Sequence, residues 1–181
     1  MKPIQNWLDE YAESHQNPAN IKIHWICVPL IMLSIIGLLA NIKINANIIP
    51  AYPQYNHAGM ILVIFGCIYY YILSKSLLLG MIPVSIIMLM IVSWFSTFSY
   101  PLWLTSLIIF VISWAGQFYG HKIEGKKPSF FKDIQFLLIG PAWLLSFIYK
   151  KLNIIRDCNF RVHRGTPNLK LNQEAESGAS T

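Results

Sequence analysis

Residues 58–119 read AGMILVIFGCIYYYILSKSLLLGMIPVSIIMLMIVSWFSTFSYPLWLTSLIIFVISWAGQFY, and Lys75 is the only charged residue among them. In the whole 181-residue chain, 55% of the residues are hydrophobic and 12% are charged, whereas soluble domains carry about 25% charged residues. A soluble core has no use for so long an uncharged run, but the hydrocarbon of a bilayer requires one. The sequence therefore predicts an all-α integral membrane protein.

Four apolar runs are long enough to cross about 30 Å of hydrocarbon; they cover residues 24–42, 58–74, 77–99 and 101–119. A fifth apolar run, 134–149, is shorter and has Gly140-Pro141 near its middle. Trp25, Trp94, Trp103 and Trp143 are expected as aromatic residues at the membrane interfaces. We expect four transmembrane helices followed by a fifth segment that does not cross.

The N-terminal residues predict a short amphipathic helix over 3–14 that lies in the membrane interface. Asn17-Pro18 should end this helix, and Asn20 can cap the first transmembrane helix. The sequence after residue 165 is rich in Asn, Gln, Ser and Gly, which is typical of a disordered tail. We therefore predict one membrane-embedded domain over 1–165 and a disordered tail over 166–181.

Positive charges set the expected orientation. With the N-terminus inside, the cytoplasmic side receives the four lysines of the 120–133 loop and the basic tail, while loop 43–57 carries one lysine. This agrees with the positive-inside rule. A fifth crossing would place the basic tail outside, so 134–149 is predicted to be either re-entrant, broken at Gly140-Pro141, or surface-lying. Both termini are then cytoplasmic.

This topology brings two polar clusters to one membrane face. The first consists of Tyr11, His15, Asn20 and His24, and the second of Gln117, His121 and Glu124. Ionisable groups beside apolar helices are costly to keep dry and usually have a function. Imidazoles with a carboxylate suit Fe(II), Mn or Zn, and a His-rich site with open positions suits Fe(II) and O₂.

His15, His24 and His121 are the expected metal ligands, and Gln117, Asn20 and Tyr11 are expected to orient their ring nitrogens. Two further residues leave alternatives open. Glu124 is either a ligand or acid–base group, or a solvated charge beside Lys122 or Lys127, which is the commoner case for such residues. His163 either completes the site or belongs to the solvated basic tail.

Several classes of protein fit the sequence less well. Nucleic-acid binding is a poor explanation for the positive charge of so apolar a chain. The five histidines form none of the HxxxH or HxxHH boxes of membrane di-iron enzymes. The main alternative is a non-enzymatic lipid-binding or scaffolding membrane protein whose histidines only form hydrogen bonds.

Two motifs resemble a known family. They are Tyr11-x₃-His15-x₄-Asn20-x₃-His24 followed by Pro29, and Trp114-x₂-Gln117-Phe118-x-Gly120-His121-x₂-Glu124-x₃-Pro128, with Pro141 downstream. In this order they resemble the small membrane-embedded Fe(II)-dependent 2-hydroxy fatty acid dioxygenases of the eukaryotic endoplasmic reticulum and their bacterial relatives. The resemblance extends over about residues 1–150.

The resemblance implies α-oxidation, in which a 2-hydroxy fatty acid and O₂ give a fatty acid one carbon shorter, a step used in sphingolipid breakdown. It implies Fe(II) at His15, His24 and His121, with Glu124 and Gln117 as catalytic residues. Lys122, Lys126 or Lys127 would attract the substrate carboxylate. The membrane would be a bacterial inner membrane or the endoplasmic reticulum; the sequence leaves the oligomeric state open.

Overall fold

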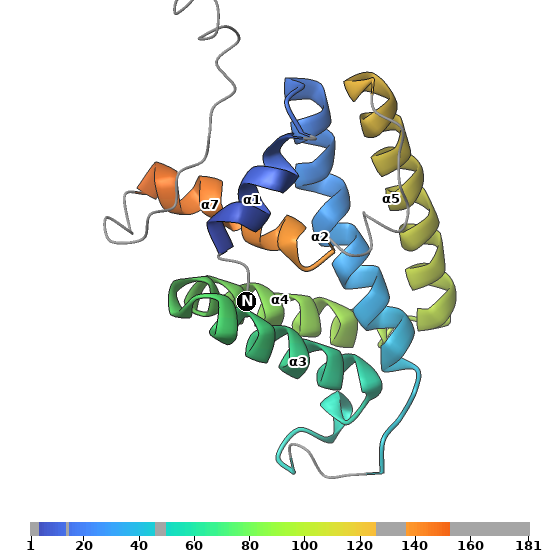
Figure 1. Ribbon diagram of the computed structural model, residues 1–181. Helices are drawn as coiled ribbons and strands as arrows, with labels where there is room; N and C mark the ends of the chain where they lie inside the picture. Colours follow the sequence, from blue (N-terminus) through green and yellow to red (C-terminus); the bar gives the residue numbers. More distant parts are fainter. Residues whose placement is uncertain (1–3, 14, 46–49, 126–136, 153–181) are drawn as a thin grey trace, which may run out of the picture.

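The computed structural model of the protein describes residues 4–13, 15–45, 50–125 and 137–152. Within these ranges the chain consists of helices and short turns, with one backbone bridge between Lys43 and His57. The helices are α1 (Ile4–Glu13), α2 (Pro18–Ala40), η1 (Pro53–Tyr55), α3 (Ala58–Leu73), α4 (Lys75–Phe95), α5 (Leu102–Glu124) and α7 (Ile139–Leu152) (Figure 1). The predicted all-α class is confirmed.

Three of the described helices, α2, α4 and α5, are long and apolar enough to cross a membrane. Helix α3 has 16 residues, fewer than the roughly 20 that a span needs. The count of four spans therefore stays a prediction. The predicted boundaries also shift, because α2 begins at Pro18 instead of residue 24 and α5 continues to Glu124 instead of ending at 119.

The start of α2 corrects the predicted cap. Asn17, not Asn20, caps the helix, and its side-chain oxygen accepts a hydrogen bond from the Ala19 backbone N–H at 2.9 Å. Pro18 then takes the first helical position, where its missing N–H costs nothing. Asn20 consequently lies inside the first turn and is fully buried, on the side of α2 that faces α5.

Helices α2 and α5 run antiparallel side by side and form the most extensive helix–helix contact of the structure (Figure 1). Small residues allow their close approach. A Cβ atom added to Gly116 would lie 2.6 Å from Cys27 Sγ, and one added to Gly120 would collide with the Asn20 side chain. Tight packing of small residues is a common way to associate membrane helices, and here it joins the start of α2 to the end of α5.

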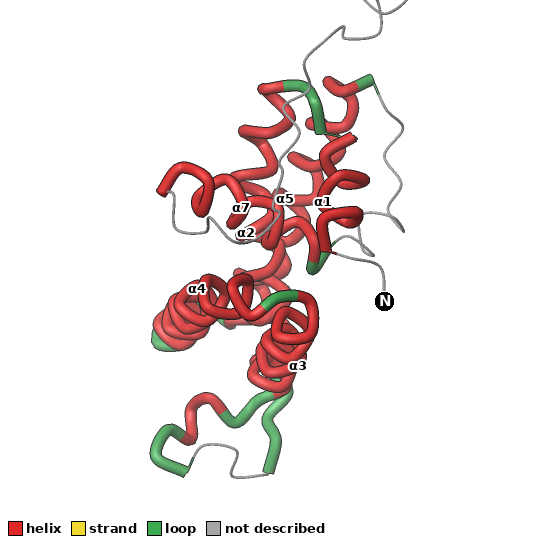
Figure 2. Tube along the Cα trace, turned by 60° about the vertical axis from the view of Figure 1, so that its left-hand side comes forward, coloured by secondary structure: helices red, strands yellow, loops and turns green. Residues whose placement is uncertain are grey.

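Helices α3 and α4 cross this pair instead of running along it. In Figure 1 they lie across the lower part of α2, and in Figure 2 they are seen almost end-on while α2 remains upright. Ser74 alone links them, since α3 ends at Leu73 and α4 begins at Lys75. Helix α7 packs against α1, α2 and α4.

Helix α7 is a buried helix. Ile139, Ala142, Trp143 and Ser146 are at most 2% exposed, and the Tyr70 hydroxyl on α3 donates a hydrogen bond to the Leu138 carbonyl just before the helix at 2.7 Å. Gly140-Pro141 lies in its first turn, where proline is tolerated, so the predicted break there is wrong. Trp143 was expected at the membrane interface and is instead a core residue.

Residues 126–136 and 153–181 lie outside the described part of the chain. The predicted disordered tail 166–181, the boundary of the domain at 165 and the beginning of segment 134–149 fall there. The orientation of the termini likewise stays a prediction.

His57, which the sequence places in a loop, is the N-cap of α3. It is 3% exposed, and its Nδ1 accepts a hydrogen bond from the Met60 backbone N–H at 3.2 Å. Burial, and then the charge of Lys43, lower the pKa of His57. Protonation would remove the acceptor, so the cap operates with a neutral ring.

We expect His57→Ala to lower the free energy of unfolding by about 1 kcal/mol, the usual contribution of a helix cap. The unfolded chain binds a proton at His57 more readily than the folded chain, so this contribution is fully present above the ordinary pKa of about 6.5 and is lost as the pH falls below it. The melting temperatures of the wild-type protein and His57→Ala, measured in detergent, should therefore differ more at pH 7.5 than at pH 5. An equal separation at both pH values would contradict the role of the neutral ring.

Candidate metal centre

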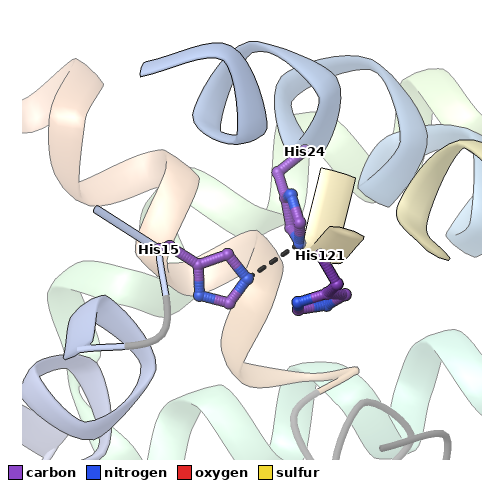
Figure 3. A group of neighbouring side chains, drawn as sticks. All are labelled: His15, His24 and His121. Carbon is purple, nitrogen blue, oxygen red and sulfur yellow. Dashed lines mark hydrogen bonds between the residues drawn. The ribbon is translucent and has the colours of Figure 1, made fainter. Parts of the chain in front are cut away.

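Three histidines from separate parts of the sequence meet beside the α2–α5 contact. His15 follows α1, His24 lies in the second turn of α2, and His121 lies in the last turn of α5. The antiparallel packing of α2 and α5 brings the last two together, and the short α1–α2 connection adds the first. Figure 3 shows the three rings turned toward one another.

The geometry of the rings is compact and dry. One ring nitrogen of each histidine lies within 4.8 Å of the others, and the ring centroids of His15 and His24 are 5.3 Å from that of His121. All three residues are buried, with 5%, 1% and 6% of their surface exposed for His15, His24 and His121. This is the only group of three or more metal-competent side chains among the described residues.

Hydrogen bonds to the backbone fix two of the rings. His15 Nδ1 lies 2.6 Å from the Tyr11 carbonyl oxygen, and His24 Nδ1 lies 3.0 Å from the Asn20 carbonyl oxygen. A carbonyl oxygen only accepts hydrogen bonds, so each Nδ1 carries the proton. In a neutral ring, the lone pair available for a metal then sits on Nε2.

These two Nε2 atoms face each other at 2.8 Å. Two lone pairs at this distance repel unless a proton or a cation lies between them. Two ligand atoms of one metal ion are separated by a similar distance, roughly 3–4 Å. The donor set, the fixed tautomers and the dryness of the site therefore fit a divalent metal such as Fe(II) or Zn(II).

Tyr11 and Asn20 were expected to orient the histidine ring nitrogens, and both residues contact a histidine ring. Their backbone carbonyls hold the histidine rings. The signal was present in the sequence, because Tyr11 and His15, like Asn20 and His24, are four residues apart, the spacing at which a histidine reaches back to a helical carbonyl. The Tyr11 side chain stacks on the His15 ring at 4.1 Å.

Trp143 is a contributor that the sequence analysis missed. Its ring lies 5.6 Å from the His15 ring and 5.2 Å from the Tyr11 ring, between centroids. It belongs to a buried apolar cluster made of Leu8, Tyr11, Val28, Ile139, Trp143 and Leu144. This cluster closes one side of the centre and excludes water from His15.

A small cavity of about 20 Å³ opens beside His24 and His121, which is room for one or two water-sized molecules. Its wall consists of Tyr11, His24, Val28, Ile31, Trp114, Gln117, His121, Leu137 and Gly140. The buried Gln117 Oε1 accepts no hydrogen bond from any described residue. A buried amide oxygen without a partner is costly, so the cavity suits a ligand that can donate to it.

Glu124 makes contacts that the sequence did not suggest, while its expected roles as a metal ligand, an acid–base group or a solvated charge stay predictions. Its carboxylate accepts hydrogen bonds from the Gln16 backbone N–H at 2.8 Å, the Asn17 backbone N–H at 2.9 Å and Asn20 Nδ2 at 3.0 Å. These hydrogen bonds join the end of α5 to the segment that carries His15. Lys127 lies outside the described residues, so the expected pairing of Glu124 with Lys122 or Lys127 stays a prediction.

The remaining candidates are three lysines and His163. Lys122 is exposed, on the last turn of α5. Lys126, Lys127 and His163 lie outside the described residues, so their roles stay predictions.

Comparisons with known proteins agree with this centre. A family model described as "2-hydroxy-palmitic acid dioxygenase Mpo1-like" matches residues 1–152. The chain is also 25% identical over 150 residues to "2-hydroxy-palmitic acid dioxygenase MPO1" of Saccharomyces cerevisiae, across 81% of this chain and 80% of the yeast protein. No solved structure matches the chain. The matched range contains all three histidines.

Proposed function

Because the chain belongs to the Mpo1-like family of 2-hydroxy-palmitic acid dioxygenases, we propose that it is an Fe(II)-dependent dioxygenase. It would shorten 2-hydroxy fatty acids by one carbon at a membrane surface. The observation that carries the assignment is the pair of Nε2 lone pairs of His15 and His24, 2.8 Å apart, with each Nδ1 held by a carbonyl. A shared cation stabilises two lone pairs at this distance, so the pair supports a metal centre.

The proposed reaction balances without an added reductant. A 2-hydroxy acid, R–CH(OH)–COOH, and O₂ give R–COOH, CO₂ and water. The bond between the carboxyl carbon and the hydroxyl-bearing carbon breaks, and the substrate itself supplies the four electrons that reduce O₂. A 2-oxo acid cosubstrate is therefore unnecessary.

His15, His24 and His121 would hold the ion, and bound Fe(II) would supply the redox chemistry that lets O₂ react with the substrate. The chain does the rest. Gln117 Oε1 can accept a hydrogen bond from the substrate's 2-hydroxyl group in the cavity beside His121. The apolar cluster around Trp143 keeps water from the centre, and Glu124 holds the His15 segment against α5.

The charge pattern supports a cytoplasmic position for this face and for both termini. The membrane would be a bacterial inner membrane or the endoplasmic reticulum. Lys122, Lys126 and Lys127 would raise the local concentration of the anionic substrate. The partners of the protein are then the lipid bilayer, a 2-hydroxy fatty acid and O₂.

One experiment tests the proposal against the alternative of a non-enzymatic lipid-binding or scaffolding protein. The protein is purified in detergent with Fe(II) under anaerobic conditions, its bound metal is measured, and O₂ uptake is followed after addition of 2-hydroxypalmitate. We expect about one iron per chain, O₂ uptake that depends on substrate, and a C15 fatty acid as product. A folded protein with neither iron nor O₂ uptake would support the alternative.

A further inference from the structure

A second, larger cavity lies on the other side of Val28 from the histidine centre. It has a volume of about 140 Å³ and is lined almost entirely by apolar side chains of α2, α3, α4 and α7. Its volume is close to that of apolar protein cavities of about 150 Å³ that stay dry and bind benzene-sized molecules. A cavity of this kind in the core of a small domain costs stability, which suggests that an apolar ligand fills it.

The two cavities are adjacent. Val28 lines both of them. Leu137 and Gly140 line the histidine cavity, while their neighbours Leu138 and Pro141 line the apolar one. Val28 is thus a wall common to the two cavities, and a molecule with a polar head at His24 and His121 would have to pass it to place an apolar tail in the larger space.

The apolar cavity also adjoins the outer face of the protein. Val63 on α3 and Ser85 on α4 line this cavity. The same two residues also line an open groove between α3 and α4, whose exposed surface is apolar. Its apolar lining suits a molecule that arrives from the hydrocarbon of a bilayer.

We propose that the cavity between α2, α3, α4 and α7 holds part of the alkyl tail of the 2-hydroxy fatty acid and sets the range of chain lengths that the protein accepts. The proposal rests on the function proposed above for the histidine centre. It assigns the tail to a defined set of walls, in which Gly66, Met81 and Met88 lie away from the three histidines.

Gly66 offers a clean way to fill the cavity. It lies on α3 and lines the cavity, and a Cβ atom added to it would meet no other atom within 4 Å. A larger side chain can therefore enter the space without displacing the backbone. Alanine at the same position is the matched control, because it removes the glycine from the helix but leaves most of the cavity open.

The first test compares substrates of different length. Each buried methylene contributes about fourfold to binding, so a phenylalanine that displaces three of them should weaken long substrates on the order of 50-fold. In Gly66→Phe, the ratio of kcat/KM for 2-hydroxypalmitate to that for 2-hydroxyoctanoate should fall by about this factor, with bound iron unchanged. Gly66→Ala should keep the wild-type ratio, and so should Ile72→Phe, which enlarges an exposed residue of the same helix.

An unchanged ratio in Gly66→Phe, in a protein that retains iron and consumes O₂, would overturn the tail site and leave the proposed function standing. The absence of iron and O₂ uptake in the wild-type protein would instead refute the proposed function. The two failures are therefore distinguishable.

The second test needs neither turnover nor a variant that folds. 2-Hydroxypalmitate with a diazirine at the end of its tail is bound to the wild-type protein without O₂ and irradiated, and the labelled peptides are identified by mass spectrometry. Labels at Met81 and Met88, competed by unlabelled 2-hydroxypalmitate, are the expected result. Labels confined to outward-facing residues such as Ile72 and Trp94, or cavity labels that the unlabelled acid does not compete, would show that ordinary membrane lipid fills the space and would overturn the proposal.

Discussion

His121→Ala is expected to abolish iron binding and O₂ uptake together. His121 lies on α5, so its ring is the contribution of that helix to the centre, and its removal leaves two imidazoles at the site among the described residues. Loss of a group that merely orients a metal ligand typically costs 10–100-fold, so loss of a ligand should cost about 100-fold or more in activity. Helix α5 should persist, because alanine is a good helix former.

Iron per chain, measured by atomic spectroscopy, and O₂ uptake with 2-hydroxypalmitate check this expectation. His57→Ala is the matched control, since His57 is equally buried but caps α3 away from the centre. That variant should lose some stability and keep its iron. Wild-type turnover in His121→Ala would end the iron-dioxygenase assignment for this protein.

The meeting of the two histidine clusters could be predicted from topology alone. Loop charges place the start of the first long helix and the end of the last one at the same membrane face, and antiparallel packing then brings His24 near His121. The closeness of this contact could not be predicted, because it depends on which residues face each other across two helices. Gly116 against Cys27 and Gly120 against Asn20 become pairs only once the register is known.

Some helix boundaries and directions could not be predicted correctly from short sequence patterns. Asn17 and Asn20 are both good caps, and Pro18 gives the advantage to Asn17 because proline prefers the first helical position. Gly140-Pro141 looked like a break within an apolar run, but α7 starts beside it, where proline is harmless. The crossing of α3 and α4 over α2 left no pattern in the sequence, since apolar helices look alike whatever their direction.

Glu124 illustrates the same limit at the site. A carboxylate followed by a glycine and two lysines is most often a solvated charge, and no sequence rule indicates that it accepts hydrogen bonds from residues more than one hundred positions earlier. Its partners are the backbone N–H groups of Gln16 and Asn17, next to His15, and the side chain of Asn20, whose carbonyl holds His24. Glu124 is therefore placed to position two of the three histidines.

Glu124→Gln should accordingly weaken iron binding without removing a ligand. The amide keeps the size of the side chain, but its NH₂ group would face donors, so at least one hydrogen bond to a charged acceptor, which contributes about 2 kcal/mol, is lost. We expect the dissociation constant for Fe(II) to rise about 10- to 100-fold, as for other groups that orient ligands. Excess Fe(II) should then restore turnover, because His15, His24 and His121 are intact.

Rescue by iron separates the possible roles of Glu124. A ligand or an acid–base group would leave turnover low at saturating Fe(II), as His121→Ala should. A solvated surface charge would leave both iron affinity and turnover at wild-type values. The positioning role predicts low activity at limiting iron and nearly full activity at saturating iron, measured as O₂ uptake across an Fe(II) titration. We expect this outcome because the Glu124 carboxylate accepts its hydrogen bonds from Gln16, Asn17 and Asn20, and these residues lie between the ligands His15 and His24 in the sequence.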